Sequence, residues 1–168
     1  NKKVALLYPN NANGLSYADE KTGVRPVLTE KGYEYVMPDL YPPGMEDFTQ
    51  LISLYKREGC EIVMGSASTP DLSNFWKQSL QQGFQPKLLA NGIAMLFPAG
   101  VESIGETMTN GLAEAHWHNT FPYVSSLTGQ TCQELADEYE EKTGTQWSMP
   151  LLLHKLPARL LPLRSTAT

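Results

Sequence analysis

Hydrophobic and polar positions alternate along this chain with two different periods. Short apolar runs of strand length occur at Val4 to Tyr8, Tyr33 to Met37, Ile62 to Met64, Leu88 to Ala90 and Gly111 to Trp117. Between them, apolar residues recur at the spacing of one helix face. Because strands and helices alternate throughout, the pattern predicts an α/β fold: a doubly wound, parallel five-stranded sheet with right-handed crossovers and helices on both faces.

The helices are predicted from apolar spacing and from residues that start or stop helices. Helical segments are expected over 15–31 with a break near Gly23, between Asp47 and Gly59, over 70–82, and over 131–142 behind a capping box of Thr131 and Glu134. Residues 93–104 are apolar but interrupted by proline and glycine, and we expect them to cover the edge of the sheet.

One stretch combines a strand end, a polar loop and a helix start. Ile62 to Met64 have the apolar character of a strand buried on both faces, and Gly65 lets the backbone turn without a Cβ clash. Thr69 is the predicted N-cap of the next helix, with Pro70 at its first position. Ligands of open parallel sheets bind at the carboxyl ends of strands, so this loop is the predicted place for a ligand.

Uncharged polar residues also follow the other strand ends. The set comprises Asn10, Asn11, Asn13, Ser66, Ser68, Thr69 and Asn91. Donors and acceptors of this kind hold a small polar ligand without reacting with it. Ordinary loops carry the same residue types, so the pattern fits loops without a ligand equally well.

Composition narrows the class of protein. A chain of 168 residues is long enough for one domain with a substantial core. The net charge of -5 and the lack of a Lys/Arg cluster argue against nucleic-acid binding. No apolar run approaches the ~20 residues of a membrane span, so no membrane insertion is expected. Cys60 and Cys132 form no CxxC motif and are expected to be free, buried thiols.

No motif for a cofactor or a metal stands out. Glycine-rich phosphate loops are missing after the first strand. In a strand over 111–117, alternation places His116 and His118 on one face with Glu114, but two solvent-facing imidazoles without a third ligand do not predict a metal site. We therefore expect no cofactor, no metal and no enzyme activity.

The nearest enzymatic alternative is a small α/β hydrolase or transferase that uses Ser66 or Ser68. Thr69 occupies the position that must be glycine in a nucleophile elbow. Such an enzyme also requires a general base, and none of its candidates (His116, His118 and His154) is expected at these serines.

Several features, taken in order, resemble a known family. They are the strand Lys3 to Tyr8, the polar loop with Gly14, Asp47-Phe48 before a helix, the segment Gly65 to Pro70, Asn91-Gly92 at a strand end and the helix Leu135 to Gly144. Together, over residues 2–150, they resemble the second lobe of branched-chain amino acid type periplasmic binding proteins, the solute receptors of ABC importers. The resemblance implies a Rossmann-like lobe of the type I class, a periplasmic or other extracytoplasmic location, a first lobe in the same receptor and a transporter permease as partners.

The resemblance also implies ligand-contacting positions. By position these are Asn13, Ser68 and Gly92, with Ser66, Thr69, Asn91 and Trp117 nearby, and the polar-loop pattern adds Asn11. Where leucine-type receptors have a carboxylate for the ligand's ammonium, this chain has Gly92. Because the nearest acids, Asp71 and Glu102, are not expected to face the cleft, we expect neutral groups and the ring of Trp117 to meet an uncharged or anionic molecule.

The combined hypothesis is one lobe, residues 1–150, of a receptor that captures a small polar molecule, whether amino acid-like, amide or carboxylate. A sensor domain of the same fold is the second alternative. The tail, 151–168, carries two prolines and departs from the family, and it is expected to be irregular, truncated or displaced. The chain starts without a signal peptide, as a mature or internally cut chain would.

Overall fold

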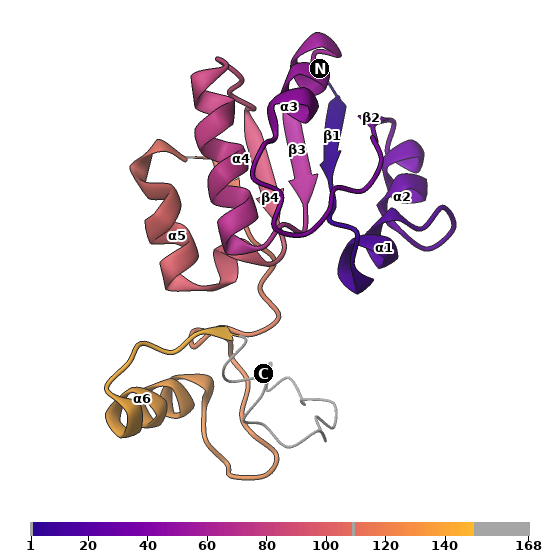
Figure 1. Cartoon of the computed structure of the whole chain (residues 1–168). Coiled ribbons are helices and arrows are strands. Elements are labelled where there is room, and N and C mark those ends of the chain that lie inside the picture. The colour runs from indigo at the N-terminus through magenta and orange to yellow at the C-terminus, as the bar shows by residue number, and fades with distance from the viewer. Residues whose placement is uncertain (1, 109, 150–168) are drawn as a thin grey trace. The chain divides into compact units, whose positions relative to one another are not determined.

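The computed structural model describes residues 2–108 and 110–149 (Figure 1). The chain forms two compact units, of which the first ends at Glu114 and the second begins at Ala115. The expected tail, 151–168, and His154 lie outside the described residues. The two units are described separately below.

The first unit is built on a five-stranded, entirely parallel sheet in the order β2-β1-β3-β4-β5. The strands are β1 (Lys3–Leu7), β2 (Glu34–Val36), β3 (Ile62–Gly65), β4 (Leu88–Asn91) and β5 (Gly111–Leu112). The predicted doubly wound α/β sheet is therefore confirmed.

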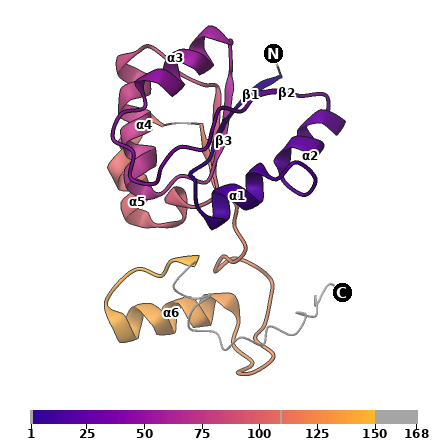
Figure 2. The same cartoon turned by 45° about the vertical axis from the view of Figure 1, so that its right-hand side comes forward.

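Helices cover both faces of this sheet (Figure 2). One face carries α1 (Ala12–Ala18) and α2 (Val24–Glu30), and the other carries α3 (Thr49–Arg57), α4 (Thr69–Gln81) and α5 (Pro98–Ile104). Strand β1 shows why, because its side chains alternate between two hydrophobic clusters. Val4 and Leu6 pack with Leu28 of α2, whereas Ala5 and Leu7 join the larger cluster of α3, α4 and α5.

Two predicted helix boundaries differ from the structure. The break near Gly23 is confirmed, since α1 ends at Ala18 and Gly23 is the N-cap of α2, but α1 begins at Ala12 instead of residue 15. Thr69 is not the N-cap of α4. That position belongs to Ser68, whose hydroxyl accepts a hydrogen bond from the Asp71 amide, so the helix begins one residue earlier than predicted.

The last part of the first unit departs further from the prediction. Residues 93–104 contain a 3-10 turn (Ala94–Leu96) and the helix α5, where an interrupted covering segment was expected. The fifth strand ends at Leu112 and does not continue to Trp117, so the predicted alternation of Glu114, His116 and Trp117 is wrong. A strand needs a neighbour to hydrogen-bond with, and β5 pairs with β4 only through Gly111 and Leu112.

Among its described residues, 115–149, the second unit contains the long helix α6 (Cys132–Thr143). The capping box predicted from Thr131 and Glu134 is present: the Glu134 amide donates to the Thr131 hydroxyl, and the Thr131 amide donates to the Glu134 carboxylate. Cys60 in the first unit and Cys132 here are both free and buried, as predicted.

Candidate functional site

Three strand ends meet at the carboxyl edge of the sheet, where the ligand was predicted. Leu7 of β1 is in register with Gly65 of β3, and Gly65 is in register with Asn91 of β4. The amide of Gly92 donates to the Gly65 carbonyl over 3.1 Å, which extends the β3–β4 pairing by one residue. The loops after these strands therefore leave the sheet at neighbouring points.

Gly65 is required for this arrangement. A Cβ at this position would lie 2.4 Å from the backbone carbonyl oxygen of Leu7, closer than any real Cβ approaches an oxygen. The prediction that a side chain would clash here is confirmed. The reason is close approach to the neighbouring strand, since the backbone of Gly65 does not have a positive φ.

The hydroxyl residues after β3 have mainly structural partners. Ser66 is almost completely buried, and its hydroxyl has no hydrogen-bond partner within the described part of the chain. Ser68 caps α4, as described above. The Thr69 hydroxyl donates to the carbonyl of Ala94 over 3.4 Å, which links the start of α4 to the loop after β4.

The polar residues after β1 lie at the start of α1. Asn11 is its N-cap, and its Oδ1 accepts a hydrogen bond from the Gly14 amide over 3.0 Å. Asn13 is exposed in the first turn of the helix. Gly14 is as tightly packed as Gly65, because a Cβ there would lie 1.8 Å from the Pro9 carbonyl oxygen.

Asn91 shapes the loop that follows β4. Its Oδ1 accepts hydrogen bonds from the amides of Ile93 and Ala94, at 3.0 and 2.8 Å. The side chain is buried, and its Nδ2 has no partner among residues 2–108 and 110–149. Asn91 therefore holds Gly92 and the following backbone in place at the sheet edge.

A cavity of about 240 Å³ lies at this edge, and it belongs entirely to the first unit. It is lined by Tyr8, Tyr17, Val24, Met64, Gly65, Ala90, Asn91, Gly92, Leu112, Ala113 and Glu114. Of the predicted ligand contacts, Asn91 and Gly92 line it. Asn11, Asn13, Ser66, Ser68 and Thr69 are not among its lining residues, and all eight assignments stay predictions.

The carboxylate of Glu114 lies beside Gly92, although no acid was expected to face the cleft there. A Cβ on Gly92 would lie 3.0 Å from Oε1 of Glu114 and 3.7 Å from the hydroxyl of Tyr17. The Tyr17 hydroxyl donates to the same Glu114 oxygen over 3.1 Å. The two acids considered from the sequence lie elsewhere: Asp71 is buried and accepts from the Gly44 amide, and Glu102 is exposed on α5.

Tyr8 and Tyr17 form the aromatic side of the cavity. Their rings are stacked, with centroids 5.6 Å apart and planes 9° from parallel. Burial, followed by the charges of Tyr17 and Glu114, raises the pKa of Tyr8. Burial and the hydrogen bond to Glu114 likewise raise the pKa of Tyr17. Both phenols thus stay protonated at neutral pH, and the hydroxyl of Tyr17 acts as a donor.

Sequence reasoning missed Tyr8, Tyr17 and Glu114 as site residues. Tyr8 continues the alternation of β1, and its position at a strand end was the available signal. Glu114 was placed on a strand face because the fifth strand was predicted too long. Tyr17 and Glu114 are 97 positions apart, so only folding brings them together.

Trp117 lies in the second unit. It is buried there, and its ring meets that of Trp147 edge-on, with centroids 5.0 Å apart. His118 packs edge-on against the same Trp147 ring and shares a hydrogen bond with the Thr120 hydroxyl. Within the described ranges, no group of three or more His, Cys, Asp or Glu side chains is arranged to hold a metal ion.

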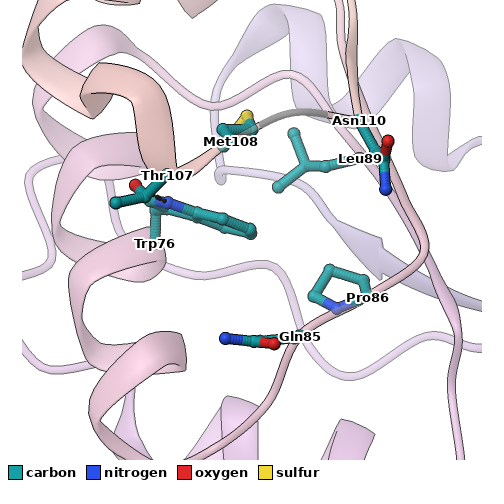
Figure 3. Close-up of a pocket in the computed structure, with 7 residues that line it drawn as sticks. All are labelled: Trp76, Gln85, Pro86, Leu89, Thr107, Met108 and Asn110. Carbon is teal, nitrogen blue, oxygen red and sulfur yellow. Dashed lines mark hydrogen bonds between the residues drawn. The ribbon is translucent and has the colours of Figure 1, made fainter.

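A second cavity of the first unit lies at the opposite edge of the sheet, at the amino ends of β4 and β5 (Figure 3). Trp76 forms one wall, and its indole Nε1 donates to the Thr107 hydroxyl over 2.9 Å. The other lining residues are Gln85, Pro86, Leu89, Met108 and Asn110. Because ligands of parallel sheets bind at the carboxyl ends of strands, the cavity at Gly92 is the better candidate site.

Comparison with known proteins agrees with this fold. The profile of a family described as "Periplasmic binding protein" matches residues 1–154. Leu/Ile/Val-binding protein homolog 8 of Brucella abortus is 21% identical over 145 residues, which are 86% of this chain and 35% of the relative. Homolog 7 of the same organism is 25% identical over 146 residues, again 35% of its length. The chain thus spans about a third of these relatives.

Solved structures of similar fold include proteins named for the amino acids they bind. A leucine-binding protein of Thermotoga maritima superposes with a TM-score of 0.69 at 19% identity, covering 88% of this chain and 40% of that one. The branched-chain amino acid substrate-binding protein of Streptococcus pneumoniae, solved with isoleucine, gives a TM-score of 0.61 at 16% identity, with the same coverage. In the part of our chain that the structure describes, no helix is long and apolar enough to cross a membrane.

Proposed function

The chain belongs to the periplasmic binding protein family, and on that premise we propose that it is one ligand-binding lobe of a solute receptor for an ABC importer. The observation that carries the proposal is the cavity at the carboxyl edge of β1, β3 and β4, where an open parallel sheet binds ligands. The relatives are named Leu/Ile/Val-binding protein homologs, and these names support the same role.

The proposed receptor is larger than this chain. Because the chain spans about a third of its relatives, a first lobe of the same receptor completes the site, and the permease of an importer is its partner. The location that fits this role is periplasmic, or otherwise extracytoplasmic. Residues 1–150 form the proposed lobe.

The proposed ligand is a small polar molecule, whether amino acid-like, an amide or a carboxylate. A cavity of about 240 Å³ is below the size of drug-binding pockets and suits a small metabolite. Asn91 and Gly92 contact the ligand from within the cavity. The polar side chains of Asn11, Asn13, Ser66, Ser68 and Thr69 flank the edge, and the assignment of Trp117 as a contact stays a prediction.

A hydrolase or transferase has less support than a receptor. Ser66 is buried, which keeps its hydroxyl from an incoming substrate. The Ser68 hydroxyl is engaged as the cap of α4. A nucleophile must be both accessible and next to a base, so neither serine offers the start of a catalytic site.

The proposal is tested by titrating the ¹⁵N-labelled chain with a panel of L-amino acids, their amides and the matching carboxylates. At least one compound is expected to shift the amides of Gly65, Gly92 and Leu112 in the millimolar range. The amide of Asn110, at the second cavity, is the internal control and is expected to stay in place. If no compound moves the Gly65 and Gly92 amides, or all of them move Asn110 equally, the cavity is not the ligand site.

A further inference from the structure

We propose that the pair Asn110-Gly111 is a site of spontaneous deamidation, a covalent modification that converts an asparagine side chain into a carboxylate. Asparagine is followed by glycine at three places in the chain: Asn13-Gly14, Asn91-Gly92 and Asn110-Gly111. All three pairs have the sequence that the reaction requires. The fold protects the first two and leaves the third able to react.

The reaction consumes only water from the solvent. The backbone nitrogen of the glycine attacks the side-chain amide carbon of the asparagine and closes a succinimide ring. The side-chain nitrogen leaves as ammonia, together with the proton that the backbone nitrogen gives up. Water then opens the ring: cleavage at the side-chain carbonyl gives aspartate, and cleavage at the main-chain carbonyl gives isoaspartate, whose backbone is longer by one methylene. Glycine favours ring closure because it has no side chain to shield its nitrogen and restricts the backbone least.

The pair Asn13-Gly14 is protected by the start of α1. Asn13 is exposed, but the amide of Gly14 donates to Oδ1 of Asn11 over 3.0 Å as part of the helix cap. Attack by this nitrogen requires that the cap opens and the first turn unwinds. The Gly14 backbone is also packed against the Pro9 carbonyl, which restricts its rotation.

The pair Asn91-Gly92 is protected by burial and by hydrogen bonds to both reacting groups. Asn91 is 2% exposed, and its Oδ1 accepts from the amides of Ile93 and Ala94. The amide of Gly92 donates to the Gly65 carbonyl over 3.1 Å. Ring closure here requires that the loop after β4 leaves the sheet edge.

The pair Asn110-Gly111 lacks these protections. Asn110 is exposed in the turn before β5, at the second cavity (Figure 3). The amide of Leu89, the residue opposite Gly111 in the parallel register, donates to the Asn110 carbonyl over 3.1 Å. This bond directs the amide of Gly111 away from β4. Because β5 is the edge strand of the sheet in the described part of the chain, no further strand accepts from that amide.

The modification acts on the pairing of β4 with β5. That pairing joins Leu89 to Gly111 and Ala90 to Leu112, next to the hydrogen bond at the Asn110 carbonyl. Isoaspartate lengthens the backbone at this point, so β5 cannot keep both the hydrogen bond and its register. Leu112 lines the cavity at the carboxyl edge of the sheet, and the modification therefore changes one wall of that cavity.

The test follows deamidation of the intact chain at mildly alkaline pH over time. Each sample is cleaved after glutamate, which places the three pairs on separate peptides, and mass spectrometry measures the amide-to-acid mass gain in each. Asn110 is expected to deamidate at least about tenfold faster than Asn13 or Asn91, because the fold must open locally before those two can react. In guanidinium chloride the three rates are expected to converge, since the differences come from the fold.

Two variants at residue 110 separate the chemistry from its consequence. Asn110→Gln moves the side-chain amide one methylene farther from the Gly111 nitrogen, and it is expected to remove the fast reaction while Asn13 and Asn91 react as slowly as before. Asn110→Asp carries the charge of the aspartate product without a longer backbone. The Leu112 amide resonance is expected to shift in the isoaspartate fraction of the aged chain, and to shift less in Asn110→Asp.

Three results would count against the proposal. If Asn110 stays intact in the folded chain, the assignment of the site is overturned, whatever happens in guanidinium chloride. If Asn13 or Asn91 reacts as fast as Asn110 in the folded chain, the fold does not select the site. If the Leu112 amide is the same in the isoaspartate fraction as in the fresh chain, the effect on β5 is refuted.

Discussion

Two glycines at the carboxyl edge of the sheet have different physical roles. Gly65 sits against the backbone of β1, where a Cβ would meet a carbonyl that cannot move without breaking the sheet. Gly92 sits against the end of the flexible Glu114 side chain, which can rotate away. The first glycine is required by the fold, and the second leaves room in the proposed site.

This difference predicts that the same substitution destabilises the protein at one glycine and has little effect at the other. Gly65→Ala is expected to lower the free energy of unfolding by about 1–3 kcal/mol, the usual cost of overpacking. Gly92→Ala is expected to stay within about 0.5 kcal/mol of the parent chain. Urea unfolding followed by the Trp76 indole resonance, which reports on the first unit, measures both. Equal losses for the two variants would contradict the prediction.

At the scale of elements, two adjacent hydroxyl residues at the start of α4 have different roles. Ser68 has extended backbone angles and accepts from the Asp71 amide, whereas Thr69 is already helical and donates to Ala94. The side chain of the N-cap residue, which stands directly before the first helical one, is placed to accept from a free amide of the first turn. The observed cap is therefore Ser68, although both residues are of types that caps favour.

Ser68→Ala is accordingly expected to destabilise the first unit by about 1 kcal/mol through loss of the cap. Thr69→Ala removes a hydrogen bond of the same 3.4 Å length to the Ala94 carbonyl but leaves the cap in place, so a smaller loss is expected. The same urea experiment compares them. If Thr69→Ala lowered the free energy of unfolding as much as Ser68→Ala, the assignment of the cap to Ser68 would be contradicted.

The capping box of α6 leads to a pH prediction. The backbone hydrogen bond from Thr131 is the main cause that holds the pKa of Glu134 below its ordinary value of 4.5. A carboxyl group whose pKa is lower in the folded state stabilises that state above the unfolded pKa, and the contribution disappears as pH falls through the folded pKa. The first turn of α6 is expected to be well ordered at neutral pH and to fray below about pH 4.5.

Carbon chemical shifts of residues 132–135, recorded over this pH range, measure the loosening. Glu134→Gln keeps an acceptor without a titrating group, so the shifts of its first turn are expected to depend less on pH. A Glu134 titration at or above its ordinary pKa would refute the argument.

At the scale of the whole molecule, the chain is expected to bind its ligand weakly. The proposed site is half of a two-lobe site, and polar contacts that remain open to water contribute only about 0.5–1.5 kcal/mol each. Isothermal titration calorimetry of the chain with the best compound of the panel tests this. Submicromolar affinity would show that one lobe is sufficient.

The division of the chain after Glu114 also bears on the proposed lobe of residues 1–150. All residues that line the cavity belong to the first unit, and so do the two hydrophobic clusters that β1 joins. We predict that residues 1–114 expressed alone fold and keep the amide shifts of β1 and β3. A spectrum typical of an unfolded chain would mean that residues beyond Glu114 are needed for folding.

The sequence by itself determined the elements whose causes are local. The apolar periods of β1 and α3, the break at Gly23 and the capping box at Thr131 all depend on residues within a few positions of each other. Their order then restricted the sheet to a parallel, doubly wound topology, because crossovers between parallel strands follow one hand.

Only the tertiary structure decided which side chains share the site. The length of β5 depends on how far β4 can pair with it, and its early end at Leu112 changed the position of Glu114. Tyr17 meets Glu114 across 97 positions of sequence, and Gly92 leaves room beside them. Long-range contacts of this kind leave no periodic signal, because each depends on where the whole sheet places two unrelated segments.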